Sequence, residues 1–254
     1  MKTLYFSSTG NCLYFAKELG GENFAIPKLI SENKFSFKDD VIGIVFPIYG
    51  LCIPPYIEEF LKKIEVECNY LFAIATYGFF PGAVCTELRK LTLKNGRKFD
   101  YINKIKMAEN CITFADMKNQ QGDSKSQQQQ IKTIINEIKN KTNFVQKDSF
   151  FHKIMTAHHK KNFEYPTGTG ITDKITVNDN CAGCGLCTKL CPMQNITITK
   201  GKPSFAQNCI SCGGCIQNCP NNAIHHSEEK SSARYRNPHI KAEELIIRNK
   251  LQQI

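Results

Sequence analysis

The first half of the 254-residue chain is predicted to form an α/β fold with a doubly wound parallel sheet, followed by a small cysteine-rich α+β domain. Two observations predict this division. Short apolar runs alternate with amphipathic stretches in the first half, and eight of the 13 cysteines lie between Cys181 and Cys219. The expected parts are a sheet domain at 1–145, a connector at 146–176, a cysteine-rich domain at 177–226 and a C-terminal tail at 227–254.

Three apolar runs are the clearest strand candidates: TLYF at 3–6, VIGIVFPIYG at 41–50 and YLFAIATYG at 70–78. They are rich in β-branched and aromatic residues, which is typical of strands buried on both faces of a parallel sheet. The runs at 22–26 and 99–107 are weaker candidates.

Helical spacing of apolar residues appears between these runs, at 11–20, 55–64 and 83–94. A longer helix is predicted at 123–140, where Asp123 or Ser124 can act as the N-cap. Its apolar stripe consists of Ile131, Ile134, Ile135 and Ile138. Strand–helix alternation of this kind predicts the parallel sheet.

Composition indicates a folded soluble protein, because 41% of the residues are hydrophobic and 22% are charged. The sequence lacks a signal-peptide pattern and a spanning apolar segment, so we expect a cytoplasmic protein without a membrane span. The net charge of +10 includes a lysine excess at 116–170, which would steer an acidic redox partner or, as we favour, forms a solvated surface. No basic run is long enough to indicate nucleic-acid binding.

The strongest motif is a repeat of C-x2-C-x2-C-x3-C-P, in CAGCGLCTKLCP from Cys181 and CISCGGCIQNCP from Cys209. Thiolates suit iron–sulfur clusters or zinc, but structural zinc sites usually pair two separate C-x2-C knuckles. We therefore predict two [4Fe–4S] clusters, with zinc as the alternative. In such a repeat the fourth cysteine ligates the other cluster. The expected ligands are Cys181, Cys184, Cys187 and Cys219 for the first cluster, and Cys209, Cys212, Cys215 and Cys191 for the second.

A turn of hydroxyl and amide side chains, FSSTGN, follows the first strand and opens the first helix. Backbone N–H groups at a helix start suit a phosphate. The turn lacks the GK[ST] of a nucleoside-triphosphate loop and the G-x-G-x-x-G of a dinucleotide loop. Plain helix capping is the alternative. The candidate phosphate-binding residues are Ser7, Ser8, Thr9, Gly10, Asn11 and Cys12.

This turn resembles the loop of flavodoxins that binds the phosphate of FMN, although flavodoxins usually have a hydroxyl where this chain has Cys12. FPIYG at 46–50 and TYGFFPG at 76–82 resemble the two loops that flank the flavin ring. Tyr49 or Tyr77 would stack on the ring, and partial burial at a strand end is the alternative explanation for each. The resemblance implies Pro47, Ile48, Tyr49 and Gly50 on one side of the ring, and Thr76, Tyr77, Gly78 and Gly82 on the other.

The cysteine repeat resembles bacterial two-cluster ferredoxins. Together with the flavodoxin-like motifs and RYRNP at 234–238, the chain resembles the EFR-type ferredoxins, in which a flavodoxin-like domain is fused to a two-[4Fe–4S] ferredoxin. The resemblance implies an electron-transfer protein that passes electrons between FMN and two low-potential clusters in an anaerobic-type redox chain, without catalytic side chains.

The alternative function is a flavin-dependent reductase of a small substrate, supplied with electrons by its own clusters. His152, His158 and His159 are the candidate proton donors, although histidines beside lysines are more often solvated surface residues. A redox sensor that binds nucleic acid is a third and less favoured hypothesis, because no concentrated basic patch is present.

Overall fold

The computed structural model describes residues 1–120, 124–162 and 169–247. The chain divides into two compact units. Met1–Ser7, Asn11–Ala108 and Asp123–Tyr165 form the first, here called the sheet unit. Ser8–Gly10, Glu109–Gly122 and Pro166–Ile254 form the second, here called the cysteine unit.

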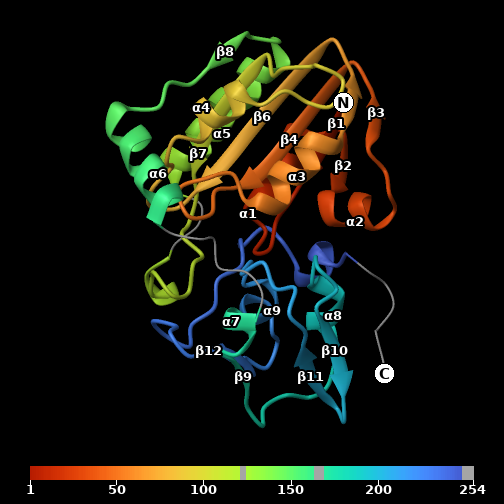
Figure 1. The fold of residues 1–254 in the computed structure, drawn as a ribbon, viewed down its shortest axis with the longest axis vertical. Coiled ribbons are helices and arrows are strands. Elements are labelled where there is room, and N and C mark those ends of the chain that lie inside the picture. Colours follow the sequence, from red (N-terminus) through yellow and green to blue (C-terminus); the bar gives the residue numbers. More distant parts are fainter. Residues whose placement is uncertain (121–123, 163–168, 248–254) are drawn as a thin grey trace. The chain divides into compact units, whose positions relative to one another are not determined.

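The sheet unit contains a six-stranded parallel sheet in the order β2-β1-β4-β6-β7-β8 (Figure 1). Numbered by their order in the chain, its strands run 2-1-3-4-5-6, which is the flavodoxin-like arrangement of a doubly wound fold. The predicted α/β class is confirmed. A two-stranded sheet pairs β3 (Ser36–Lys38) with β5 (Glu65–Glu67). The strands of the large sheet are β1 (Lys2–Tyr5), β2 (Glu22–Ala25), β4 (Val41–Pro47), β6 (Tyr70–Tyr77), β7 (Tyr101–Lys106) and β8 (Phe144–Val145).

The two central strands are buried on both faces. Every residue of β4 after Val41 is buried, and every residue of β6 before Tyr77 is buried. Packing between them is close, since a Cβ added to Gly43 would lie 2.0 Å from Cζ of Phe72. The continuous apolar runs in the sequence therefore correspond to strands that have no solvent-facing side.

The helices of the sheet unit are α1 (Asn11–Leu19), α2 (Ile26–Ser31), α3 (Pro55–Lys63), α4 (Val84–Lys90), α5 (Lys125–Lys139) and α6 (Phe150–Asn162). Helix α1 packs on β1 and β4, and α5 packs on β7. Ser124 is the N-cap of α5 and accepts a hydrogen bond from the Gln127 amide at 3.2 Å. Asp123, the other candidate cap, lies outside the described residues. Helix α4 ends at Lys90, because Leu91 is extended.

Helix α6 lies in the stretch that the sequence predicts to be a connector. Thr156 is its only buried residue, whereas Phe150 is 78% exposed and Phe151 is 64% exposed. The helix therefore has no buried apolar stripe from which it could be predicted. Its N-terminus is marked instead by Ser149, whose hydroxyl accepts a hydrogen bond from the His152 amide at 3.1 Å.

The cysteine unit has short elements and two antiparallel strand pairs. The pairs are β9 (Ile175–Val177) with β12 (Ile224–His226), and β10 (Ile196–Thr199) with β11 (Lys202–Phe205). This arrangement confirms a small α+β domain. Its helices are η1 (Met117–Asn119), α7 (Thr169–Thr172), α8 (Leu186–Leu190), α9 (Gly214–Gln217) and η2 (Ala242–Leu245). Within the described parts of the chain, no helix has the length and apolar character needed to cross a membrane.

Candidate metal centre and cofactor loops

The two cysteine motifs are placed by equivalent local structures. In each, a left-handed glycine opens a short helix: Gly185 has φ 71° before α8, and Gly213 has φ 67° before α9. Residues other than glycine rarely adopt this backbone conformation. The third cysteine of each motif, Cys187 or Cys215, lies within the helix that follows.

The first cysteine group surrounds a cavity. Cys181, Cys184 and Cys187 line it from the first motif, and Cys219 from the end of the second motif completes the set. The apolar walls of this cavity are formed by residues that include Ile198, Pro203 and Ile224. The cavity thus brings together the four cysteines that the sequence predicts as ligands of one cluster.

The cysteines that raise the pKa of Cys187, Cys212 and Cys215 belong mostly to the group expected for each. Burial raises the pKa of Cys187 to about 12, and negative charge on Cys184, Cys181 and Cys219 contributes. Burial also raises the pKa of Cys212 to about 12, with Cys191 the largest charged contributor.

The pKa of Cys215 is raised well above its usual value by burial, then by Cys212, Cys191 and Cys209, and last by Cys187 of the first motif. Cys191 therefore influences buried thiols of the second motif, and Cys219 influences Cys187 of the first. Thiolates gathered in this way need nearby cations, and iron–sulfur clusters supply them.

Backbone amides donate to the last sulfur of each motif. The amide of Asn195 lies 3.3 Å from Sγ of Cys191, and the amide of Ala223 lies 3.3 Å from Sγ of Cys219. The donor is four residues beyond the cysteine in both motifs. Such hydrogen bonds stabilise negative charge on sulfur and raise the reduction potential of a cluster that it ligates.

Among the described residues, no three His, Cys, Asp or Glu side chains converge on a point suited to a single metal ion. A [4Fe–4S] cluster takes one thiolate at each iron, so its ligands surround a group of atoms rather than a point.

Residues 180–224 match the family model described as a 4Fe-4S dicluster domain. The matched segment contains all eight cysteines of the repeat. It is therefore a ferredoxin-like iron–sulfur domain with an electron-transfer role, which confirms the interpretation of the repeat as iron–sulfur. No curated protein matches the chain.

Part of the predicted phosphate turn, Ser8–Gly10, belongs to the cysteine unit. The carbonyl of Ser8 accepts a hydrogen bond from Nδ2 of Asn218 at 2.9 Å, and the carbonyl of Thr9 accepts one from the Asn237 amide at 2.8 Å. Oγ1 of Thr9 accepts one from Nδ2 of Asn110 at 2.6 Å. The sequence analysis missed all three asparagines, and the only signal was RYRNP, which contains Asn237.

The rest of that turn belongs to the sheet unit. The Cys12 thiol lies 3.2 Å from the Thr76 hydroxyl, so the structure brings together a residue of the turn and a residue near the C-terminal end of β6. Burial raises the pKa of Cys12 to about 12, and the thiol is therefore protonated at neutral pH. Nδ2 of Asn11 donates to the carbonyl of Ala108 at 3.1 Å.

The loops after β4 and β6 contact each other. Tyr49 and Cys52 exchange backbone hydrogen bonds at 3.2 and 3.0 Å, which closes a tight turn at Gly50. A Cβ added to Gly82 would lie 1.9 Å from the carbonyl oxygen of Leu51. Close packing between the loops therefore explains why position 82 is a glycine, and no ligand is needed for this explanation.

The other predicted ring-contacting residues lie at the same strand ends. Tyr49 packs edge-on against Phe6, with ring centroids 6.3 Å apart. Tyr77 and Gly78 are half-buried, as is Ile48, whose amide donates to the carbonyl of Thr76 at 2.8 Å, while Pro47 is buried.

Helix α6 makes hydrogen bonds to the loops after β4 and β6. The Thr156 hydroxyl accepts from the Ala83 amide at 2.9 Å and lies 3.2 Å from the Leu51 carbonyl, to which it donates. One turn later, Nε2 of His159 lies 2.7 Å from the position of a Cβ added to Gly50. Of the candidate proton donors, His159 therefore adjoins a predicted flavin loop, whereas His158 is exposed.

Proposed function

We propose that the protein transfers single electrons through two [4Fe–4S] clusters in the cysteine unit and exchanges them with FMN bound by the sheet-unit loops and the turn at 7–12. The first cluster would be held by Cys181, Cys184, Cys187 and Cys219. The second would be held by Cys209, Cys212, Cys215 and Cys191. The dense cysteines favour a reducing compartment such as the cytoplasm.

One observation carries the iron–sulfur part of this proposal. The dicluster match spans eight cysteines, and the cavity lined by Cys181, Cys184 and Cys187 of the first motif is also lined by Cys219 of the second. A last cysteine that joins the other motif in this way is what two neighbouring cubane clusters require.

The flavin part rests on topology. The 2-1-3-4-5-6 strand order has its switch point between β1 and β4, where open α/β sheets take ligands. The turn passes through Gly10, at φ 97°, directly into α1. The first amides of a helix point toward the preceding turn, so they suit a terminal phosphate.

When bound, FMN supplies exchange of one or two electrons, and each cluster supplies exchange of one. The side chains around these groups set potentials and exclude water. Redox proteins are the expected partners, and the lysine excess at 116–170 would steer those that have an acidic surface.

Anaerobic purification followed by analysis of iron, sulfide and FMN tests the proposal. We expect about eight iron and eight sulfide ions per chain, as two [4Fe–4S] clusters require, together with one FMN. Zinc in place of iron would overturn the cluster assignment. Iron and sulfide without FMN would overturn the flavin assignment alone.

A negative charge added to the phosphate turn tests whether this turn binds the phosphate of FMN. Ser7→Asp introduces a carboxylate that repels phosphate, so FMN retention should fall at least about tenfold, the ratio that 1.4 kcal/mol of repulsion produces, while iron content stays constant. Ser36→Asp, on β3, is the matched control. Equal FMN retention in the two variants would show that the phosphate is not held by this turn.

A second function, reduction of a small substrate at the flavin, is favoured by one observation: His159 adjoins Gly50. A proton donor there should accelerate oxidation of the reduced protein by a small quinone by about a hundredfold, as for other general acids. His159→Gln would lose this acceleration, and His158→Gln would keep it. Equal rates in both variants would contradict the reductase function and leave electron transfer as the proposed function.

A further inference from the structure

Helix α6 carries its large apolar residues on the side that faces solvent. Phe150 is 78% exposed, Phe151 is 64% exposed and Ile154 is 53% exposed. Side chains three and four residues apart lie on one face of a helix, so positions 150, 154, 157 and 161 form a single stripe. All four of these positions are exposed. The usual arrangement, in which the apolar stripe of a helix faces the core, is therefore reversed in α6.

Polar contacts attach α6 to the rest of the sheet unit. The Thr156 hydroxyl bonds to the backbone of the loops after β4 and β6. Lys160 contacts Glu87 of α4, and Glu87 also accepts a hydrogen bond from the Ile53 amide at 3.1 Å. These contacts come from the side of α6 opposite to the apolar stripe. The sheet unit therefore holds the helix with its phenylalanines directed outward.

The exposed side of α6 is also positively charged. The helix contains three lysines and no carboxylate, and a further lysine, Lys147, precedes it. Within the described part of the chain, the exposed residues Lys147, Lys153 and Lys161 form no ion pair. The nearest carboxylate in the sequence, Asp148, is buried and contacts Lys104. The positive charge beside the apolar stripe is therefore uncompensated.

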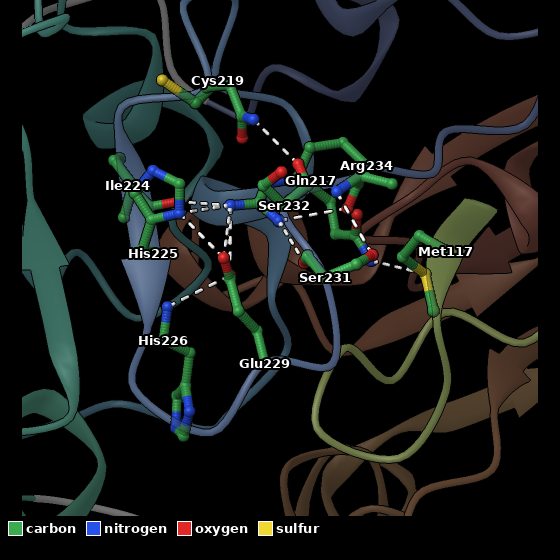
Figure 2. Close-up of polar contacts among 12 residues, drawn as sticks. Met117, Gln217, Cys219, Ile224, His225, His226, Glu229, Ser231, Ser232 and Arg234 are labelled. Atoms are coloured by element: carbon green, nitrogen blue, oxygen red, sulfur yellow. Dashed lines mark hydrogen bonds and ion pairs between the residues drawn. The ribbon is translucent and has the colours of Figure 1, made fainter.

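Cations of the cysteine unit are arranged differently. Figure 2 shows Arg234 beside Glu229, and its Nη2 lies 3.1 Å from Oε2 of that carboxylate. Lys174 pairs with Glu228 at 2.7 Å. Each of these cations has a carboxylate partner, so these positions attract an anionic surface much less than the lysines of α6 do.

We propose that this side of α6 is a docking surface for an anionic phospholipid bilayer. The surface, here called the α6 face, consists of Phe150, Phe151, Ile154, Lys147, Lys153 and Lys161. Its apolar side chains enter the boundary between lipid headgroups and acyl chains, and its lysines meet the lipid phosphates. The proposal goes beyond electron transfer and depends on neither cofactor.

The composition of the α6 face favours a bilayer over an acidic protein. The cores of protein–protein interfaces are depleted in lysine and enriched in arginine, whereas every cation of this face is a lysine. Lysine side chains can lie along apolar material while the ammonium group stays in water, which suits the headgroup region. Phenylalanines that project from a convex helix need a partner that deforms around them, and lipid does so.

Sedimentation with vesicles tests the proposal on the purified, iron-loaded full chain. Vesicles of phosphatidylcholine mixed with phosphatidylglycerol should bind the protein more tightly than phosphatidylcholine alone, and added salt should weaken this binding. Phe150→Ser combined with Phe151→Ser should lower partition into the mixed vesicles at least about tenfold, the factor that burial of one large apolar side chain provides. Phe114→Ser is the matched control, because Phe114 is 55% exposed in the cysteine unit.

A pair of charge variants separates the α6 face from the net charge of the chain. Lys153→Gln combined with Lys161→Gln should weaken binding to the mixed vesicles about fivefold for each lysine removed. Lys132→Gln combined with Lys139→Gln changes the net charge equally at two exposed positions of α5 and should retain binding. Equal losses in the two double variants would show that only net charge matters and would overturn the proposal.

A fluorescence measurement reports on the α6 face directly, because the sequence contains no tryptophan. The emission of Phe151→Trp should shift to shorter wavelength with the mixed vesicles and should be quenched by brominated phosphatidylcholine within them. Phe114→Trp should show neither effect.

Two results would overturn the proposal outright. One is binding to the mixed vesicles that is no tighter than binding to phosphatidylcholine alone. The other is a shift of the Phe151→Trp emission with a soluble acidic ferredoxin but not with vesicles, which would assign the α6 face to a protein partner. Iron and FMN content measured in every variant keeps these outcomes separate from the proposed electron transfer.

Discussion

The two units of this chain are stabilised by different means. In the sheet unit, β4 and β6 have seven and eight residues and are almost entirely buried. In the cysteine unit, no element among the described residues exceeds the five residues of α8. Strand β12 is three residues long, and only Ile224 of the three is buried.

The difference in burial indicates that the two units obtain their folding free energy from different sources. Apolar burial contributes roughly 25 cal/mol per Å² removed from water, so long buried strands stabilise the sheet unit directly. Short elements bury too little surface for that, and small domains of this kind commonly depend on metals. The sheet unit is therefore expected to fold without cofactors, and the cysteine unit only with its clusters.

Removal of one cluster ligand gives the largest expected effect. Cys215→Ser should lose the iron–sulfur absorbance and the amide-exchange protection of β10 and β11, because ligand binding and folding of this unit are coupled. Protection of β4 and β6 should be unchanged. Hydrogen exchange read by mass spectrometry measures both units in one sample.

Cys111→Ser is the control for that experiment, since Cys111 is an exposed cysteine of the same unit outside the motifs. It should keep the iron and the protection. A Cys215→Ser protein with protected β10 and β11 but without iron would contradict the contrast between the units.

The second largest effect concerns a buried ion pair in the sheet unit. Lys104 on β7 contacts Asp148, and their side chains are only 6% and 0% exposed. Asp148 also accepts from the Thr86 amide at 2.7 Å. Asp148→Ala leaves the lysine charge buried and unpaired, so urea denaturation should show a loss of about 3–5 kcal/mol.

A double variant distinguishes the cost of an unpaired charge from lost packing. Lys104→Met combined with Asp148→Leu removes both charges at similar volume, and such replacements are often neutral. Its stability should approach that of the unaltered protein. Equal losses in the single and double variants would show that packing, not the charge, is what the single variant disrupts.

The sequence predicted those parts of the fold that have a periodic or fixed-spacing signal. The apolar runs at 41–50 and 70–78 correspond to β4 and β6, and the isoleucine stripe corresponds to the buried face of α5. The eight cysteines were identified from spacing alone.

Features that depend on contacts between distant residues were not predictable. Lys104 lies within a strand, where its charge argues for exposure until Asp148, 44 residues away, is seen beside it. Helix α6 has Thr156 as its only buried residue, so no apolar period marks it. Asn218 and Asn237 hold Ser8–Gly10 through hydrogen bonds across more than 200 residues of sequence.

A smaller effect tests the tightness of the central strands. Gly43→Ala places a methyl group 2.0 Å from the Phe72 ring, and overpacking of this kind costs about 1–3 kcal/mol. Phe72→Leu added to Gly43→Ala should recover part of that loss, because the two residues share one space. Additive losses in the double variant would show that the strain is relieved elsewhere. The iron content should be the same in all three variants.

The smallest expected effect is at the N-terminus of α5. Ser124→Ala removes the hydroxyl that accepts from the Gln127 amide at 3.2 Å, and loss of an N-cap costs about 1 kcal/mol. Thr133→Ala is the control, since its exposed hydroxyl donates to the carbonyl of Gln129 in its own helix and alanine has the higher helix propensity. Thermal unfolding should rank the control at or above the unaltered protein and Ser124→Ala below it.

Because α5 belongs to the sheet unit, both variants should leave the cluster absorbance unchanged. A loss of iron in Ser124→Ala would mean that the stabilities of the two units are linked.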